Sequence, residues 1–404
     1  MRYNKRLIPV TLIICIFLFV LCASCAKQGI KTVVIEDNAP ASSVNEDQGL
    51  HDGKVYKFNY FNVIDNKPVN EMLFGWLDKD NTAAVVGRQD EDLTIEAINY
   101  KYHFSKEIMT MTSDISSYGL SPDGKEIAYI KGEKLYSKET QGDKDKEIGQ
   151  IDLPEQTNAS ISWSNNGRFI MFTVSGYPVG IERIYIYDNA ENEMHKIELK
   201  EMPAAASELI HTKALNYNVM ISDDGTKLLI NSIYDNSDYK VEYLAHLYQL
   251  DKETFLPETE IFINQSNKVN SQFIDNNRLI YLDMRNGSLD IYHTDTGEDN
   301  EICKLDKSSM KYPYFRVSND GKAIVFIKYL ADGTVGIYEA GIQNSKLEDE
   351  RMIYRDFLPS NIWWSGDNKK VLLSGRYAYS ERVDNARQLS PSYVSLGSII
   401  VELN

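Results

Sequence analysis

The sequence predicts an all-β fold, a seven-bladed β-propeller of four-stranded antiparallel blades, and three observations carry this prediction. A short turn phrase recurs seven times at intervals of 43 to 58 residues. An apolar run follows every copy, and a further strand-like run rich in tyrosine, isoleucine or leucine comes after it. A repeat of this length is typical of propellers and solenoids. Short hairpin strands, four to a repeat, are the composition of a propeller blade.

The turn phrase predicts a tight connection between two antiparallel strands. Asp-Gly and Asn-Gly supply the positive φ that such a turn requires, and apolar runs on both sides are the strongest short-range hairpin signal. Five clear copies start at Ser121, Trp163, Ser222, Ser318 and Trp364, and two degraded copies start at Trp76 and Ile274. Six blades are the alternative if the degraded first copy is not a true blade.

The ends of the repeat array predict how the ring closes. The last copy runs out after its third strand at Leu403, so no residues are left there for a fourth strand. A strand-like segment, Lys54–Tyr60, precedes the first copy and has nothing to pair with locally. Pairing the two would remove an exposed sheet edge. We therefore expect this N-terminal strand to complete the last blade.

The repeated phrase resembles the TolB-type, WD-like propeller repeat, in which Trp-Ser-Pro-Asp-Gly-Lys precedes an apolar strand and, later, an Ile-Tyr strand. The resemblance extends from residue 54 to residue 404 and implies a β-propeller. It leaves the activity open, because periplasmic scaffolds, sugar-acid lyases and the substrate-gating domains of serine peptidases share this fold.

The first residues predict a lipoprotein signal peptide over residues 1–24. Three basic residues precede an uncharged run over residues 7–23, which is the order of a secretory signal. The segment Cys22–Cys25 resembles a bacterial lipobox, which implies that Cys25 is diacylated and becomes the N-terminus. The alternative is a retained signal anchor. Residues 25–53 are polar and without periodicity, so we expect a flexible tether before a propeller domain over residues 54–404.

Composition restricts the compartment and the partners. Removing residues 1–24, with their three positive charges and no acids, takes the net charge from −16 to −19. Such a chain repels phosphate backbones and anionic headgroups, so we expect no nucleic-acid partner and a membrane attachment made by the lipid. The predicted localisation is extracytoplasmic, anchored to the cell membrane by N-terminal lipidation. Apart from Cys25, only Cys303 remains in the mature chain, which excludes an internal disulfide.

No sequence motif predicts catalysis, a metal or a cofactor. The chain has no G-x-S-x-G, H-E-x-x-H, P-loop or G-x-G-x-x-G motif, and its six histidines are scattered. A sugar-acid lyase of this fold would need a histidine-rich metal centre near the axis, and only His211 falls in a segment that could face it. Acidic turns at residues 235–238 and 283–290 are better explained as Asx-type turns than as calcium loops.

Three long connections predict a partner-binding face. They cover residues 201–211, 234–239 and 376–387, and strand alternation directs them to the same side of the ring. Tyrosine and arginine are enriched at binding hot spots, and long loops on a rigid scaffold often carry function. The predicted partner-binding residues are Tyr234, Tyr239, His211, Tyr377, Tyr379 and Arg382. The alternative is that these loops are solvated and bind nothing.

Together these observations predict a lipid-anchored propeller of the cell envelope that acts as a protein–protein interaction platform or a ligand-binding module. A protein or a cell-wall component is the expected partner. The rival hypothesis is a carbohydrate-active lyase or hydrolase with its site in the central channel. A channel lined by clustered carboxylates with a histidine or metal site would favour the enzyme, whereas small and apolar side chains would favour the platform.

Overall fold

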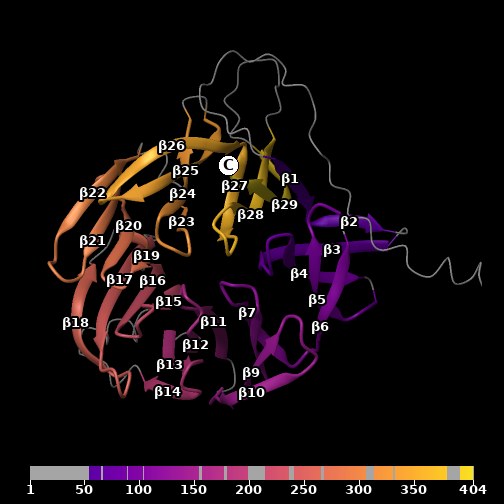
Figure 1. The fold of residues 1–404 in the computed structure, drawn as a ribbon, viewed down its shortest axis with the longest axis horizontal. Helices are drawn as coiled ribbons and strands as arrows, with labels where there is room; N and C mark the ends of the chain where they lie inside the picture. Colours follow the sequence, from indigo (N-terminus) through magenta and orange to yellow (C-terminus); the bar gives the residue numbers. More distant parts are fainter. Residues whose placement is uncertain are drawn as a thin grey trace, which may run out of the picture.

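The computed structural model describes residues 54–403 except 65–66, 89, 103, 154–156, 177–179, 199–213, 236–240, 265–267, 306–313, 331–332 and 380–391. Its strands form seven antiparallel sheets arranged in a ring (Figure 1). The predicted seven-bladed β-propeller is therefore confirmed, and the six-blade alternative is wrong because the degraded first repeat forms a complete blade. Within the described part of the chain, no helix could cross a membrane.

The first three blades follow the order of the sequence. Blade one contains β2 (Phe61–Ile64), β3 (Lys67–Trp76), β4 (Asn81–Arg88), β5 (Leu93–Asn99) and β6 (Ser105–Met111). Blade two contains β7 (Ile115–Leu120), β8 (Glu126–Lys131), β9 (Lys134–Glu139) and β10 (Asp145–Gln150). Blade three contains β11 (Thr157–Trp163), β12 (Phe169–Gly176), β13 (Gly180–Asp188) and β14 (Glu193–Glu198).

The remaining blades repeat the same pattern. Blade four contains β15 (Ala214–Ile221), β16 (Lys227–Asp235), β17 (Val241–Leu250) and β18 (Pro257–Asn264). Blade five contains β19 (Lys268–Asp275), β20 (Arg278–Asp283), β21 (Ser288–His293) and β22 (Asp299–Lys304). Blade six contains β23 (Phe315–Val317), β24 (Ala323–Tyr329), β25 (Val335–Gln343) and β26 (Lys346–Arg355). Blade seven contains β27 (Phe357–Trp364), β28 (Lys370–Tyr379), β29 (Ser392–Glu402) and β1 (Val55–Asn59).

The N-terminal strand closes the ring as the sequence predicts. Strand β1 pairs antiparallel with β29, from Val55 opposite Val401 to Asn59 opposite Gly397. Tyr56 and Phe58 of β1 are buried in the cluster between blades seven and one. The outer edge of the last blade is therefore supplied by the beginning of the propeller domain, which covers β29 from Gly397 to Val401.

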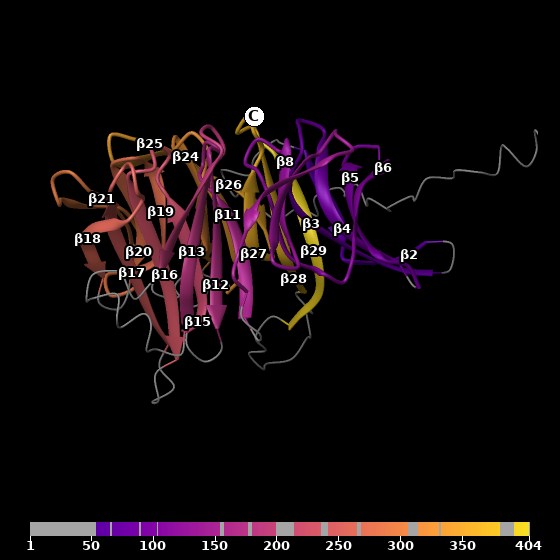
Figure 2. The same ribbon diagram turned by 90° about the horizontal axis from the view of Figure 1, so that it is seen from below.

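Blade one carries a fifth strand that the sequence analysis did not anticipate. Strand β2 pairs with the first residues of β3, from Phe61 opposite Asn70 to Ile64 opposite Lys67. The hairpin projects from the side of the ring (Figure 2). The sequence between β2 and β3, Asp65-Asn66, is not an Asp-Gly or Asn-Gly pair, so the segment shows no turn signal.

A serine fixes the geometry of five of the seven turns. In each, the serine hydroxyl donates to an aspartate or asparagine oxygen two residues later, at 2.6–2.8 Å. The serine Oγ in turn accepts the backbone N–H of the residue five positions after the serine, at 2.9–3.0 Å. These serines are Ser121, Ser164, Ser222, Ser318 and Ser365. The repeated phrase is thus a hydrogen-bonded turn that joins the first and second strands of a blade.

Side chains of the inner strands bind neighbouring blades together. The indole N–H of Trp76 donates to the backbone oxygen of Trp363, that of Trp163 to Gly119, and that of Trp364 to Arg316, at 3.1–3.3 Å. Apolar clusters fill the space between adjacent blades, for example between blades five and six and between blades six and seven. Hydrogen bonds and apolar packing therefore hold the inner strands in fixed positions around the axis.

Candidate binding channel

Two adjoining cavities lie where the inner strands meet. The larger has a volume of about 410 Å³, and residues of β3, β7, β11, β15, β23 and β27, with the turns that follow some of them, line it. The smaller has a volume of about 170 Å³ and is lined by residues from blades four to seven. Asn218, Arg316 and Trp363 line both cavities. These three residues therefore mark the junction between the cavities.

The lining follows the repeat. We count positions from the turn serine in five blades, and from Leu77 and Ile274 in the two blades with degraded turns. The residue two positions before this point lines one of the two cavities in every blade, and we call these seven residues the first layer. They are Gly75, Gly119, Ser162, Met220, Gln272, Arg316 and Trp363. The residue four positions before the turn lines the smaller cavity in blades four to seven, and we call these four the second layer. They are Asn218, Asn270, Tyr314 and Asn361. Residues two apart lie on one face of a strand, which explains the two layers.

Arg316 is the only charged residue among those that line the two cavities in the described chain. It lies on β23 between the buried Phe315 and Val317. Its side chain keeps partial access to solvent through the channel, yet it lies so deep in the ring that burial lowers the pKa of its guanidinium. No carboxylate of the described residues forms an ion pair with it. A guanidinium stays protonated even so, and Arg316 is therefore a cation to which the described residues supply no counter-charge.

Polar groups of the second layer surround this cation. The hydroxyl of Tyr314 donates to Oδ1 of Asn361 at 3.3 Å, and burial raises the pKa of that hydroxyl while the nearby charge of Arg316 lowers it. The side-chain amide of Asn218 has no hydrogen bond to the described residues. Gln272 is already committed, because its amide donates to the oxygen of Phe315 and accepts from the N–H of Val317. The groups left for a ligand are therefore mainly donors.

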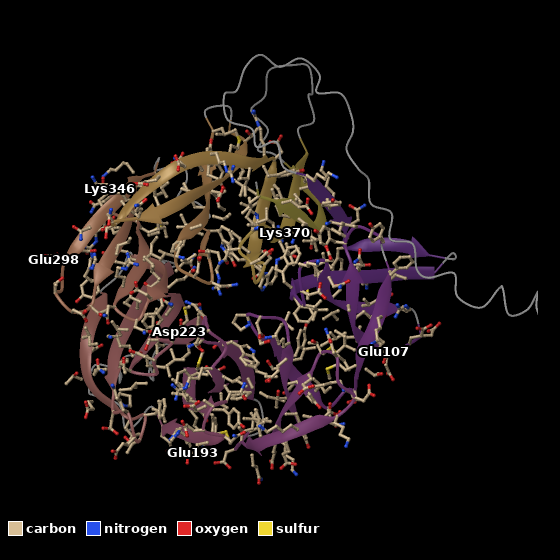
Figure 3. The ribbon with its side chains drawn as sticks, viewed as in Figure 1. Glu107, Glu193, Asp223, Glu298, Lys346 and Lys370 are labelled. Atoms are coloured by element: carbon tan, nitrogen blue, oxygen red, sulfur yellow. The ribbon has the colours of Figure 1, made fainter. Side chains whose placement is uncertain are left out.

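Carboxylates gather elsewhere in the molecule. Figure 3 shows Glu107, Glu193 and Glu298 at the outer rim of the ring, whereas Asp223 lies nearer the central opening. Asp223 does not line either cavity; its carboxylate accepts the backbone N–H of Asn166 at 2.8 Å, and burial raises its pKa. Among the described residues, no group of three histidine, cysteine, aspartate or glutamate side chains could hold a metal ion. Small and apolar residues such as Gly119, Ile161 and Met220 line the larger cavity, as expected of a platform. Aromatic and amide side chains and one cation, which we did not expect, line the cavities with them.

The structure places the predicted partner-binding residues in two groups. We expected Tyr234 and Tyr379 in loops, but they lie in strands β16 and β28. Both strands extend further than the apolar runs that predicted them. Tyr377 also lies in β28, where its hydroxyl donates to the oxygen of Ser398 at 3.1 Å and its ring packs edge-on against Phe357. Tyr239, His211 and Arg382 lie outside the described residues, as does Cys25. Their binding and lipidation roles stay predictions.

The channel residues were missed by sequence reasoning, although a signal for them existed. Once the seven turns are aligned, the first layer is a single column of the repeat. Arginine occupies this column only in blade six. Comparing what each repeat carries at the same position, instead of searching for motifs along the chain, would have singled out Arg316.

Comparison with known proteins supports the class of fold. No protein-family model and no curated protein matches the sequence. Among solved structures, an oligogalacturonate lyase from Vibrio parahaemolyticus is similar with a TM-score of 0.52 and 10% identity, over 87% of this chain and 98% of that one. The C-terminal WD40 domain of Sif2 gives 0.44 and 13%, over 87% and 90%. TolB from Acinetobacter baumannii gives 0.37 and 14%, over 71% and 66%. By its fold the chain is a seven-bladed β-propeller.

Proposed function

We propose that this protein is an envelope lipoprotein whose propeller works as an interaction platform outside the cytoplasmic membrane. Cys25 would carry the lipid, residues 26–53 would act as the tether, and the ring would present a fixed surface to a protein or cell-wall partner. This role does not require the chemistry of any of the solved neighbours, because a rigid scaffold with long connections is sufficient for recognition.

One observation carries the proposal. Because successive strands of a blade alternate in direction, the end of β14, the start of β15, the end of β16 and the end of β28 all lie on the side opposite the serine turns. The three long connections predicted from the sequence therefore begin and end on one side of a ring whose inner strands are fixed by inter-blade hydrogen bonds. This arrangement favours binding by several loops at once.

The anchor is tested by metabolic labelling of the full chain with a clickable fatty acid. The wild-type protein should take up the label and fractionate with membranes, and Cys25→Ser should lose the label. Cys303→Ser is the matched control and should keep it. Absence of label in the wild type, or label retained by Cys25→Ser, would rule out lipidation at Cys25.

The platform is tested by photo-crosslinking on intact cells. A photoreactive amino acid at Tyr239, Tyr379 or Arg382 should capture a defined partner. The controls are Lys125 and Lys322, whose side chains are 79% and 82% exposed on the serine-turn side. Capture of the same species from both sides, or from neither, would count against a partner-binding face.

A further inference from the structure

We propose that the junction of the two cavities binds a small organic acid, with its carboxylate on Arg316 and its ring against the aromatic wall of the channel. This site is distinct from the face opposite the serine turns. The two proposals can therefore fail independently.

The first support is the charge of Arg316, which no described residue compensates with an ion pair. A cation removed from bulk water is unfavourable unless an opposite charge or several hydrogen-bond acceptors surround it. The described residues offer Arg316 no ion pair, and the other residues that line the cavities are uncharged. An anionic ligand would supply the missing counter-charge. A carboxylate matches the planar guanidinium best, because it can accept two parallel N–H···O bonds.

The second support is the set of donors beside that charge. Asn218 from β15 and Asn361 from β27 line the smaller cavity together with Arg316 from β23. Since Oδ1 of Asn361 accepts from Tyr314, the amide NH₂ of Asn361 is left for a ligand. The indole N–H of Trp363 also has no acceptor among the described residues. Donors from three strands therefore converge on the place where an anion would lie.

The size and chemistry of the cavities restrict the ligand to a small monoanion. A volume of about 410 Å³ falls in the range of small-molecule sites. One guanidinium neutralises one negative charge, and a chain of net charge −16 repels polyanions. These facts disfavour a phosphate dianion or an acidic polymer.

Aromatic side chains form the wall of the larger cavity and define the rest of the ligand. Phe74 and Tyr118 pack edge-on with ring centroids 5.2 Å apart, and both line the cavity with Trp163 and Trp363. The indole N–H of Trp163 is already bonded to the neighbouring blade, so this side chain offers a ligand its carbon surface. A flat ring or the apolar face of a sugar ring would pack against such a wall. An aromatic acid and a sugar acid both meet these requirements, because each carries a carboxylate attached to a ring.

Isothermal titration calorimetry with two matched pairs of probes tests the proposal. Benzoate is compared with benzamide, and glucuronate with glucose, so that within each pair the carboxylate is the main difference. We expect at least one acid to bind and its neutral counterpart to bind at least tenfold more weakly, because a hydrogen bond to a charged group contributes roughly this factor or more. Benzoate alone would indicate an aromatic acid, and glucuronate alone a sugar acid. Failure of both acids, or preferential binding of inorganic phosphate, would overturn the proposal.

Variants separate the proposed contact from a change of fold. Arg316→Gln should weaken binding of the acid by roughly tenfold or more, and Arg316→Lys should weaken it less, because the charge remains without the planar fork. Arg183→Gln removes a half-buried arginine of β13 that does not line either cavity and should leave binding unchanged. Asn218→Asp, an isosteric change, should abolish binding by placing a carboxylate at the junction while the far-UV circular dichroism stays that of the wild type. Unchanged affinity in both Arg316→Gln and Asn218→Asp would overturn the assignment.

Discussion

At the residue scale, the same turn glycine meets different surroundings in different blades. Gly124 and Gly167 both have φ of +74°. A Cβ on Gly124 would lie 2.2 Å from the backbone oxygen of Trp76, whereas a Cβ on Gly167 would meet only Cδ of Pro122, at 3.6 Å. The turn phrase explains the positive φ in both cases. Of these two glycines, only Gly124 lies so close to the backbone of the neighbouring blade.

We therefore expect Gly124→Ala to destabilise the protein more than Gly167→Ala. Substitution at Gly167 should cost about 1–2 kcal/mol, the cost of a left-handed conformation for an L-residue. Substitution at Gly124 should add about 1–3 kcal/mol, because backbone atoms must shift to admit the methyl group. Urea unfolding of the two variants measures the difference. Equal losses would mean that the contact between the turns is unimportant.

A second expectation concerns Asp188 and pH. Burial alone would raise the pKa of Asp188, but hydrogen bonds from Arg168 and from the backbone N–H of Ala190 outweigh it and hold the pKa below its ordinary value. The folded state thus binds the proton less readily than the unfolded state. The stability that Asp188 contributes is present above the ordinary aspartate pKa, about 3.9, and is lost as pH falls through the lowered pKa.

The variant Asp188→Asn should therefore be less stable than the wild type at neutral pH, and the gap should shrink in acid. Urea unfolding from pH 7 to pH 2.5 measures it. Arg168→Gln is the paired control and should show the same convergence. A gap that stays constant over this range would show that the charge of Asp188 does not stabilise the fold.

At the scale of elements, β1 shows how a local pattern can encode a distant pairing. Its alternation puts Tyr56 and Phe58 on the buried face, and its position before the first repeat leaves β29 as the available edge. Strand β2 gave no comparable signal. Strand β2 pairs with the beginning of β3, and no Asp-Gly or Asn-Gly pair lies between the two strands in the sequence.

Removal of β1 should destabilise the whole propeller. We expect deletion of residues 1–59 to lower stability by several kcal/mol, because loss of a buried phenylalanine side chain alone costs about 3–5 kcal/mol. The exposed edge of β29 should also promote aggregation. Deletion of residues 1–53 is the control and should leave the unfolding midpoint unchanged. Thermal unfolding and light scattering compare the two, and equal behaviour would mean that β1 is dispensable.

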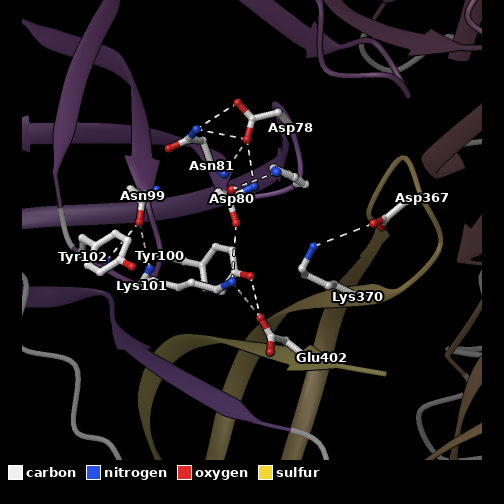
Figure 4. Close-up of polar contacts among 11 residues, drawn as sticks. Asp78, Asp80, Asn81, Asn99, Tyr100, Lys101, Tyr102, Asp367, Lys370 and Glu402 are labelled. Atoms are coloured by element: carbon white, nitrogen blue, oxygen red, sulfur yellow. Dashed lines mark hydrogen bonds and ion pairs between the residues drawn. The ribbon is translucent and has the colours of Figure 1, made fainter. Parts of the chain in front are cut away.

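At the scale of the whole molecule, side chains of the first and last blades join across the closure. The hydroxyl of Tyr100, after β5, donates to Glu402 of β29 at 2.7 Å, and Lys101 pairs with the same carboxylate at 3.4 Å (Figure 4). The ammonium of Lys370 lies 5.7 Å from the ring centroid of Trp76. These contacts join residues of the first blade to residues close to the C-terminal end of the propeller domain.

We expect the Tyr100–Glu402 bond to stabilise the closure measurably. Tyr100→Phe should cost about 1–3 kcal/mol, because the donor to a charged acceptor is lost. A double-mutant cycle with Glu402→Gln should give a coupling of about 1 kcal/mol. The exposed partner provides the control, since Lys101→Gln should cost less than 1 kcal/mol. Additive losses in the cycle would show that the two side chains do not act together.

The sequence by itself determined the repeat, the turn geometry and the closing strand, whereas the structure decided between seven blades and six. All three follow from local chemistry: Ser121 and its four counterparts specify the turn, and the apolar runs specify the strands. The tertiary structure alone decided the channel. Arg316 sits between two core residues of a three-residue strand, and only the alignment of the seven repeats distinguishes it in the sequence. The ring brings Asn218, Tyr314 and Asn361 around it, and no carboxylate of the described residues lines the cavities. Residues from different blades come together only in the closed ring, so no short sequence motif marks the site.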